Sequence, residues 1–136
     1  RATRALLPTV MLSVTVPHIL PLDQQVQLAE ELVSAGADII QTEGGTSSNP
    51  EHPGTLGLIE KAAPTLAAAA EISRAVDVPV LCASGLSNVT APLAIAAGAS
   101  GVGVGSAINK LDSEIAMVAA VRAIVESLAT VSKVRI

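Results

Sequence analysis

Two stretches of the chain, Val80-Leu81-Cys82-Ala83-Ser84-Gly85 and Gly101-Val102-Gly103-Val104-Gly105-Ser106, decide the fold. Each is typical of a short buried strand that runs directly into a turn of glycine and other small residues. The residues between the two stretches are typical of a helix. A strand, a helix and a second strand predict two parallel strands whose carboxyl ends meet at the same edge of a sheet.

The same alternation continues through the rest of the chain. We predict four strands, over residues 9–16, 37–42, 78–83 and 101–104. The predicted helices run from an N-cap at Asp23 to Gly36, over 64–76 with Pro64 in the first turn, from a cap at Ser87 or Asn88 to Gly98, and onward from a cap at Asp112. The sequence therefore predicts an α/β fold of about four βα units, as in the C-terminal half of a TIM-type (β/α)8 phosphate-binding barrel.

The length of the chain bears on this prediction. A whole barrel needs roughly 250 residues, whereas this chain has 136 and begins at Arg1 without a methionine. We expect residues 1–136 to be one partial barrel domain from a longer protein; the alternative is a half-barrel that pairs with a second copy. Open sheet edges and an uncovered apolar face would favour contact with the N-terminal half or self-association.

Composition narrows the classes of partner. Half of the residues are apolar, the chain has no aromatic residue, and the net charge is −4. Neither a base-stacking platform nor a basic surface is expected, which argues against nucleic-acid binding. Proline and glycine interrupt the uncharged stretch 78–109, which argues against a membrane helix. The lone Cys82 excludes an internal disulfide and is consistent with a reducing compartment.

Two glycine turns at adjacent strand ends predict an anion site. Backbone N–H groups at Ser84, Gly85, Gly105 and Ser106 can converge on a phosphate, with the two serine hydroxyls as additional donors. The alternative is that these glycines only make tight strand-to-helix turns. Lys110 either adds positive charge to this site or is an ordinary surface lysine.

Candidate catalytic groups follow the first two strands. Glu43 comes directly after a strand and before paired glycines, where a carboxylate could act as general acid or base or could simply be solvated. His18 could assist by moving a proton near neutral pH, or be a surface residue. We expect His52 to be a loop residue and Cys82 a buried small hydrophobe, and the spacing of the histidines predicts no metal site. The long connection 44–55 is a candidate lid.

Four motifs together resemble the hypothetical chloroplast reading frame 23 family of cyanobacteria and plastids. They are Val14-Thr15-Val16-Pro17-His18, Gln41-Thr42-Glu43-Gly44-Gly45-Thr46-Ser47-Ser48, Leu81-Cys82-Ala83-Ser84-Gly85-Leu86-Ser87 and Gly101-Val102-Gly103-Val104-Gly105-Ser106-Ala107. The resemblance implies βα units five to eight of a TIM-type barrel, in a cyanobacterial cytoplasm or a plastid stroma. It supplies no reaction.

A second resemblance is to the nitronate monooxygenase branch of flavin barrels. It rests on Gly36-Ala37-Asp38-Ile39-Ile40, Gly44-Gly45, Pro79-Val80, Gly98-Ala99, Gly101-Val102 and Gly105-Ser106. In that branch the last two strand ends bind the flavin phosphate, so the resemblance implies FMN as a possible cofactor. Thr46 stands where that branch carries a catalytic histidine, which puts the oxidation chemistry in doubt.

Three functions are compatible with these residues. The first is an aldolase-type barrel enzyme acting on a small phosphorylated metabolite, with Ser84, Gly85, Gly105 and Ser106 on the phosphate and Glu43 and His18 in catalysis. The second is an FMN-dependent oxidoreductase with the flavin phosphate in the same place. The third is a non-catalytic metabolite sensor whose contacts with a partner protein change when phosphate binds.

Overall fold

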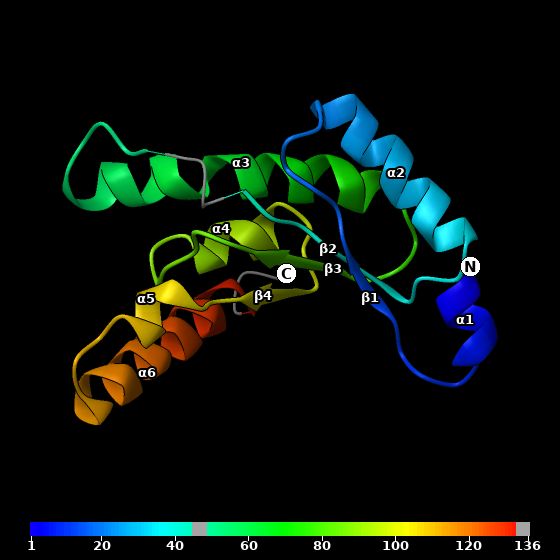
Figure 1. Cartoon of the computed structure of the whole chain (residues 1–136). Helices are drawn as coiled ribbons and strands as arrows, with labels where there is room; N and C mark the ends of the chain where they lie inside the picture. The colour runs from blue at the N-terminus through cyan, green and yellow to red at the C-terminus, as the bar shows by residue number, and fades with distance from the viewer. Residues whose placement is uncertain (45–48, 133–136) are drawn as a thin grey trace.

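The computed structural model describes residues 1–44 and 49–132, in which helices and strands alternate (Figure 1). The elements in chain order are α1 (Ala2–Leu6), β1 (Ser13–Thr15), α2 (Leu22–Ser34), β2 (Ile39–Gln41), α3 (Gly54–Ala75), β3 (Val80–Ala83), α4 (Ala91–Ala96), β4 (Gly101–Gly103), α5 (Ser106–Asn109) and α6 (Glu114–Ser132). The predicted α/β class is confirmed.

The strands form one parallel sheet in the order β1-β2-β3-β4. Ile40 of β2 is in register with Val14 on one side and Val80 on the other, and Leu81 of β3 is in register with Gly101. All four carboxyl ends therefore lie at one edge of the sheet, as the two opening stretches predicted. Closure into a barrel stays a prediction.

One face of the sheet is packed against helices because apolar side chains alternate along each strand. Ile40, Val80 and Cys82 are fully or almost fully buried, whereas Leu81 and Ala83 between and after them are only half buried. In Figure 1, α2 and α3 lie side by side over this sheet, and α6 lies beside α4. The buried residues form two clusters, one under α2 and α3 and one between α3, α4 and the last two strands.

Helix α3 differs most from the prediction. It begins at Gly54, ten residues before the expected start, so Pro64 lies inside the helix and not in its first turn. An internal proline removes one helical hydrogen bond and costs about 3 kcal/mol. Burial of Ala68, Ala69 and Ile72 on the same helix offsets this cost. Tertiary packing therefore overrides the local signal of Pro64.

The ends of α2 show one correct and one wrong prediction. Gly36 has a φ of +103°, and the N–H groups of Gly36 and Ala37 donate to the carbonyls of Val33 and Leu32. These two bonds form the Schellman motif that ends many helices, so the predicted glycine end is confirmed. Asp23, however, is not the N-cap, because the helix begins at Leu22 and Asp23 lies within its first turn.

The later caps are each shifted from the predicted residue. Thr90 is the residue before α4, whereas Ser87 caps the turn that leads into this helix: its hydroxyl oxygen accepts the Val89 N–H at 3.2 Å and its carbonyl accepts the Ala91 N–H at 2.8 Å. At α6, the hydroxyl oxygen of Ser113 accepts the Ala116 N–H at 3.2 Å, so Ser113 caps the helix in place of Asp112. Both shifts are within the usual uncertainty of helix ends.

The predicted first strand is wrong over residues 9–12, because the side chain of Arg4 organises this segment differently. The Arg4 guanidinium donates to the Gly36 carbonyl at 2.7 Å and pairs with the Asp38 carboxylate, which also accepts the Leu12 N–H at 2.8 Å. It further donates to the carbonyls of Leu7, Pro8 and Val10. One cation thus ties α1 and the following loop to the amino ends of β1 and β2.

We expect Asp38→Asn to lower the midpoint of thermal unfolding at pH 7 by a few degrees. Hydrogen bonds from Leu12 and Arg4 hold the pKa of the Asp38 carboxyl below its usual range. A depressed pKa stabilises the folded chain above the unfolded value of about 3.9, and this contribution is lost as the pH falls through the folded value. Thermal melts of both proteins from pH 7 to pH 3 should therefore converge below about pH 4. A pH-independent difference would contradict this assignment.

Candidate active site at the carboxyl edge of the sheet

The predicted site residues form two groups just past the strand ends. His18 follows β1 and Glu43 follows β2, and these two side chains are in contact. Ser84, Gly85, Gly105 and Ser106 follow β3 and β4, and they line one pocket. The structure thus brings together the members of each group, although His18 and Glu43 are not among the residues that line the pocket.

The His18–Glu43 pair has the geometry of an oriented imidazole. One carboxylate oxygen of Glu43, Oε1, accepts the backbone N–H of His18 at 3.1 Å and lies 3.0 Å from His18 Nδ1. The His18 side chain is 18% exposed and that of Glu43 38%. With Nδ1 as the donor, His18 Nε2 becomes the atom that can exchange a proton with a ligand.

The charge state of Glu43 follows from the same contacts. Hydrogen bonds from the side chain and then the backbone of His18 hold the pKa of the Glu43 carboxyl below its usual range. A carboxyl with a lowered pKa stays ionised at neutral pH and cannot serve as a proton donor there. This geometry favours Glu43 as the group that orients His18, and it favours His18 for proton transfer.

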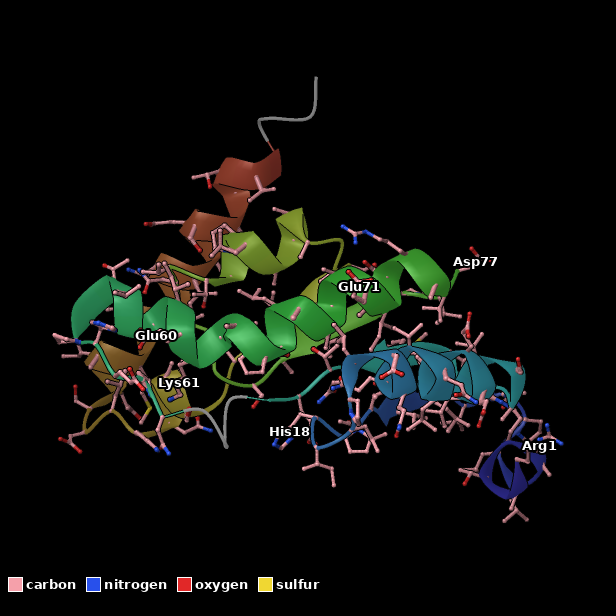
Figure 2. The ribbon with its side chains drawn as sticks, turned by 90° about the horizontal axis from the view of Figure 1, so that it is seen from above. Arg1, His18, Glu60, Lys61, Glu71 and Asp77 are labelled. Carbon is pink, nitrogen blue, oxygen red and sulfur yellow. The ribbon has the colours of Figure 1, made fainter. Side chains whose placement is uncertain are left out.

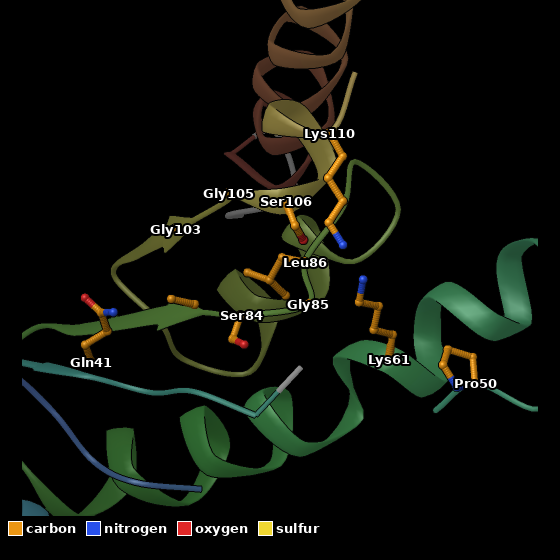
Figure 3. A pocket seen from close by; sticks show the side chains of 11 residues that line it. Gln41, Pro50, Lys61, Ser84, Gly85, Leu86, Gly103, Gly105, Ser106 and Lys110 are labelled. Atoms are coloured by element: carbon orange, nitrogen blue, oxygen red, sulfur yellow. The ribbon is translucent and has the colours of Figure 1, made fainter. Parts of the chain in front are cut away.

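The pocket has a volume of about 770 Å³ and lies against the last two strands (Figure 3). The turns after β3 and β4 form one part of its lining, and the small Ala83 and Gly103 at the strand ends form another. The remaining lining residues are Gln41, Pro50, Lys61, Leu86 and Lys110. A volume of this size lies within the range of roughly 300–1,000 Å³ that is typical of small-molecule sites.

The turn after β3 has an uncommon backbone. Ser84 has a φ of +79° and Gly85 one of +74°, and Ser84 is the sole non-glycine residue with a positive φ in the part of the chain that the structure describes. A serine in this region costs of order 1–3 kcal/mol, and such residues cluster at functional sites. Both residues line the pocket.

The turn after β4 leaves space beside its glycine. A Cβ atom added at Gly105 would meet no atom within 4 Å, whereas one at Gly103 would lie 3.1 Å from the Cβ of Ala83. A side chain at Gly103 would thus crowd the neighbouring strand, whereas one at Gly105 would contact none of the residues that the structure describes. Its φ of −115° is also open to other residues.

A buried hydroxyl network fixes the end of β3. Thr65 of α3 donates its hydroxyl proton to the Ala83 carbonyl, and its oxygen lies 2.6 Å from the hydroxyl of Thr42, which can then donate to it. The Cys82 thiol donates to the Thr65 carbonyl at 3.6 Å. Cys82 is buried as predicted, and burial raises the pKa of its thiol.

Part of the predicted lid, residues 45–48, lies outside the described residues. The residues just after it are tied to α3, because Glu60 accepts the backbone N–H groups of Glu51 at 2.8 Å and His52 at 3.2 Å. His52 Nδ1 also lies 2.5 Å from the second carboxylate oxygen of Glu60. His52 is thus a loop residue, as expected, and its contacts hold Pro50 near the pocket.

Sequence reasoning missed Lys61. The predicted helix start at Pro64 left this residue in a loop, whereas α3 carries it to the pocket wall. Figure 2 shows Lys61 at the opposite end of the molecule from Arg1. The sequence leaves Lys110 as either an additional charge of the phosphate site or a surface lysine, and in the structure it lines the same pocket.

The residues that the structure describes contain neither a cluster of metal ligands nor a membrane-spanning helix. Within residues 1–44 and 49–132, no three His, Cys, Asp or Glu side chains lie where they could hold a metal ion together. Over the same residues, no helix has the length and apolar character needed to cross a membrane.

Comparison with known proteins places the chain among relatives of undescribed activity. Residues 1–134 match the model of a family described as "Protein of unknown function (DUF561)". A protein of Porphyra purpurea named "Uncharacterized protein ycf23" is 41% identical over 91 residues, which are 67% of this chain and 34% of that protein. The protein of the same name from Cyanophora paradoxa is 44% identical over 87 residues, 64% of this chain and 35% of that protein.

The matched residues thus span about a third of the length of these curated relatives. The matches confirm the family resemblance that the four sequence motifs predicted.

Proposed function

We propose, for a chain that belongs to the family described as "Protein of unknown function (DUF561)", that its pocket binds the phosphate group of a small metabolite. The carrying observation is the space at Gly105, a pocket residue where an added Cβ would meet nothing. Among the described residues, the missing side chain at Gly105 serves no packing need, and it lets a ligand approach the backbone closely. The left-handed turn at Ser84 and Gly85 supports the proposal from the neighbouring strand.

We further propose that the four βα units belong to a TIM-type barrel. The sheet order leaves β1 and β4 each with one strand neighbour, so further strands can extend the sheet at either edge. The relatives are about three times as long as the part matched here, which leaves length for further units in those proteins. The remaining units, or a second copy, would then cover the half-buried face that carries Leu81 and Ala83.

The proposed activity is proton transfer to or from the bound phosphorylated metabolite. A metabolite held by its phosphate at the ends of β3 and β4 would extend along the same edge of the sheet to His18, which moves the proton while the Glu43 carboxylate orients it, as their contact at 3.0 Å supports. We also propose that the protein works in a plastid or a cyanobacterial cell, which the name ycf23 of its relatives supports.

Binding of inorganic phosphate to a Gly105→Asp variant tests the proposed site. The added carboxylate would occupy the space at Gly105 and repel the anion, so we expect affinity to fall at least about tenfold. Ala107→Asp is the matched control, because it adds the same charge at an exposed position of α5 outside the pocket lining. Calorimetric titration of all three proteins gives the comparison. Equal affinities, or no binding to the original chain, would contradict the proposal.

A flavin is the second candidate, and the volume of the pocket favours it. About 770 Å³ is more than a phosphate needs and leaves space for an attached organic group. The lysines and glycine turns fit the phosphate of FMN, but the chain has no aromatic residue to stack on its ring. Flavin absorbance in the purified protein would favour FMN, and its absence after soaking with FMN would count against it.

A further inference from the structure

The charged groups of the pocket are all cationic. Two lysines, Lys61 and Lys110, line it together with neutral residues, and no aspartate or glutamate does so among the described residues. The chain as a whole has a net charge of −4, so this local excess of positive charge runs against its composition. A pocket with such a lining attracts anions and disfavours cations.

The two lysines reach the pocket from different elements. Lys61 comes from the first half of α3, and Lys110 directly follows α5. Figure 3 shows the two side chains extending from opposite sides with their amino groups pointing toward one another, close to Ser106. Two ammonium groups facing each other repel, and an anion held between them removes that repulsion.

We propose that the pocket selects a dianionic phosphate monoester over a monoanion of the same shape, and that Lys61 supplies the second positive charge. This inference rests on the proposed phosphate site and specifies its ligand class. A phosphate monoester carries about −1.5 to −2 at pH 7, which matches two lysines. A sulfate monoester or a phosphate diester carries a single charge, so its attraction to the two lysines is weaker.

Phenyl phosphate and phenyl sulfate form a matched pair of probes. They share the phenyl ring, which suits the apolar lining at Leu86, Ala83 and Pro50, and they differ in charge. Calorimetric titration of the full chain at pH 7.5 should show phenyl phosphate binding about tenfold more tightly, since one additional charge-assisted contact has this order of effect.

Lysine variants locate the source of the discrimination. Lys61→Met should weaken phenyl phosphate binding about tenfold and phenyl sulfate binding much less, and Lys110→Met should behave alike. Arg74→Met is the control, because Arg74 lies in the last turn of the same helix, is exposed, and pairs with Glu71 outside the pocket. It removes the same charge and should leave both affinities unchanged.

The pH dependence gives a second readout. Phenyl phosphate loses its second charge below a pH of about 6, so its affinity should fall toward that of phenyl sulfate at pH 5. Equal affinities for the two probes at pH 7.5 would overturn the proposed preference for a dianion, and so would a Lys61→Met variant that still prefers phenyl phosphate as strongly as the original chain. Neither result would contradict the proposed phosphate site. If neither probe binds, the proposed phosphate site and its proposed preference for a dianion are both overturned. Clear preference for phenyl phosphate, lost in Lys61→Met and retained in Arg74→Met, would support both.

Discussion

Glu43→Gln is expected to lower kcat by up to about 10²–10⁴-fold for a phosphorylated compound that the protein converts, because general acid–base catalysis contributes this order of rate and His18, its proposed agent, is oriented by Glu43. Glutamine keeps an oxygen that can accept the two hydrogen bonds from His18 but removes the negative charge. The imidazole would keep its place and lose the charge that stabilises its protonated form. Binding should not change, because Glu43 does not line the pocket.

The measurement needs both turnover and binding. Metabolite screening identifies a converted compound, and phenyl phosphate titration reports the pocket independently. His18→Asn should lower kcat at least as far as Glu43→Gln, whereas Glu71→Gln, which removes an exposed carboxylate paired with Arg74, should leave kcat unchanged. Unchanged turnover in both site variants would contradict the catalytic assignment. Tight binding without chemical change in the original chain would favour the metabolite sensor.

Thr65→Val is expected to lower the free energy of unfolding by about 1–3 kcal/mol, the range for leaving a buried hydrogen-bonding partner unsatisfied. Valine has nearly the shape of threonine, so the loss comes from the hydroxyl. That hydroxyl donates to the Ala83 carbonyl and accepts from Thr42, and both threonine side chains are fully buried. Urea denaturation followed by circular dichroism measures the change.

A double-mutant cycle separates the hydroxyl pair from packing. The double variant Thr42→Val, Thr65→Val should lose less free energy of unfolding than the two single variants lose in sum. Each single change leaves the other hydroxyl without its hydrogen-bond partner, whereas the double change removes both hydroxyls. Thr130→Val is the exposed control, because the Thr130 hydroxyl donates to a carbonyl within α6. A Thr65→Val protein as stable as the original chain would show that the network does not hold β3 in place.

The sequence was most informative where one signal was local and repeated. Alternating β and α segments and the Gly36 helix end depend on neighbours in the chain, and the structure has both. The start of α3 and the role of Arg4 depend on contacts between residues far apart. Gly36 and Asp38 are 32 and 34 residues from Arg4 in the sequence, and no local pattern predicts their contacts with it.

For the candidate site, too, the residues that could be predicted are those with a local sequence signal. Ser84, Gly85, Gly105 and Ser106 could be predicted because each stands next to a strand whose end was recognisable, and the structure brings them to one pocket. Lys61 could not be predicted as a site residue, because the expected helix began at Pro64 and Lys61 lay before it, outside any predicted element. The contact between His18 and Glu43 joins the ends of two strands, so the residues could be named from sequence but their pairing could not.

The sequential strand order has a consequence for how the chain folds during its synthesis. Each strand pairs with the next one along the chain, so no pairing has to wait for a segment made much later. The first two strands can meet once β2 has left the ribosome, and each later unit can add to an existing edge. Assembly of this kind is stepwise, but each step must bring together two strands that are separated by a helix, and such pairing is slower than the formation of local contacts. It also leaves the newest edge exposed until the next unit arrives, which is when a nascent chain is most open to aggregation.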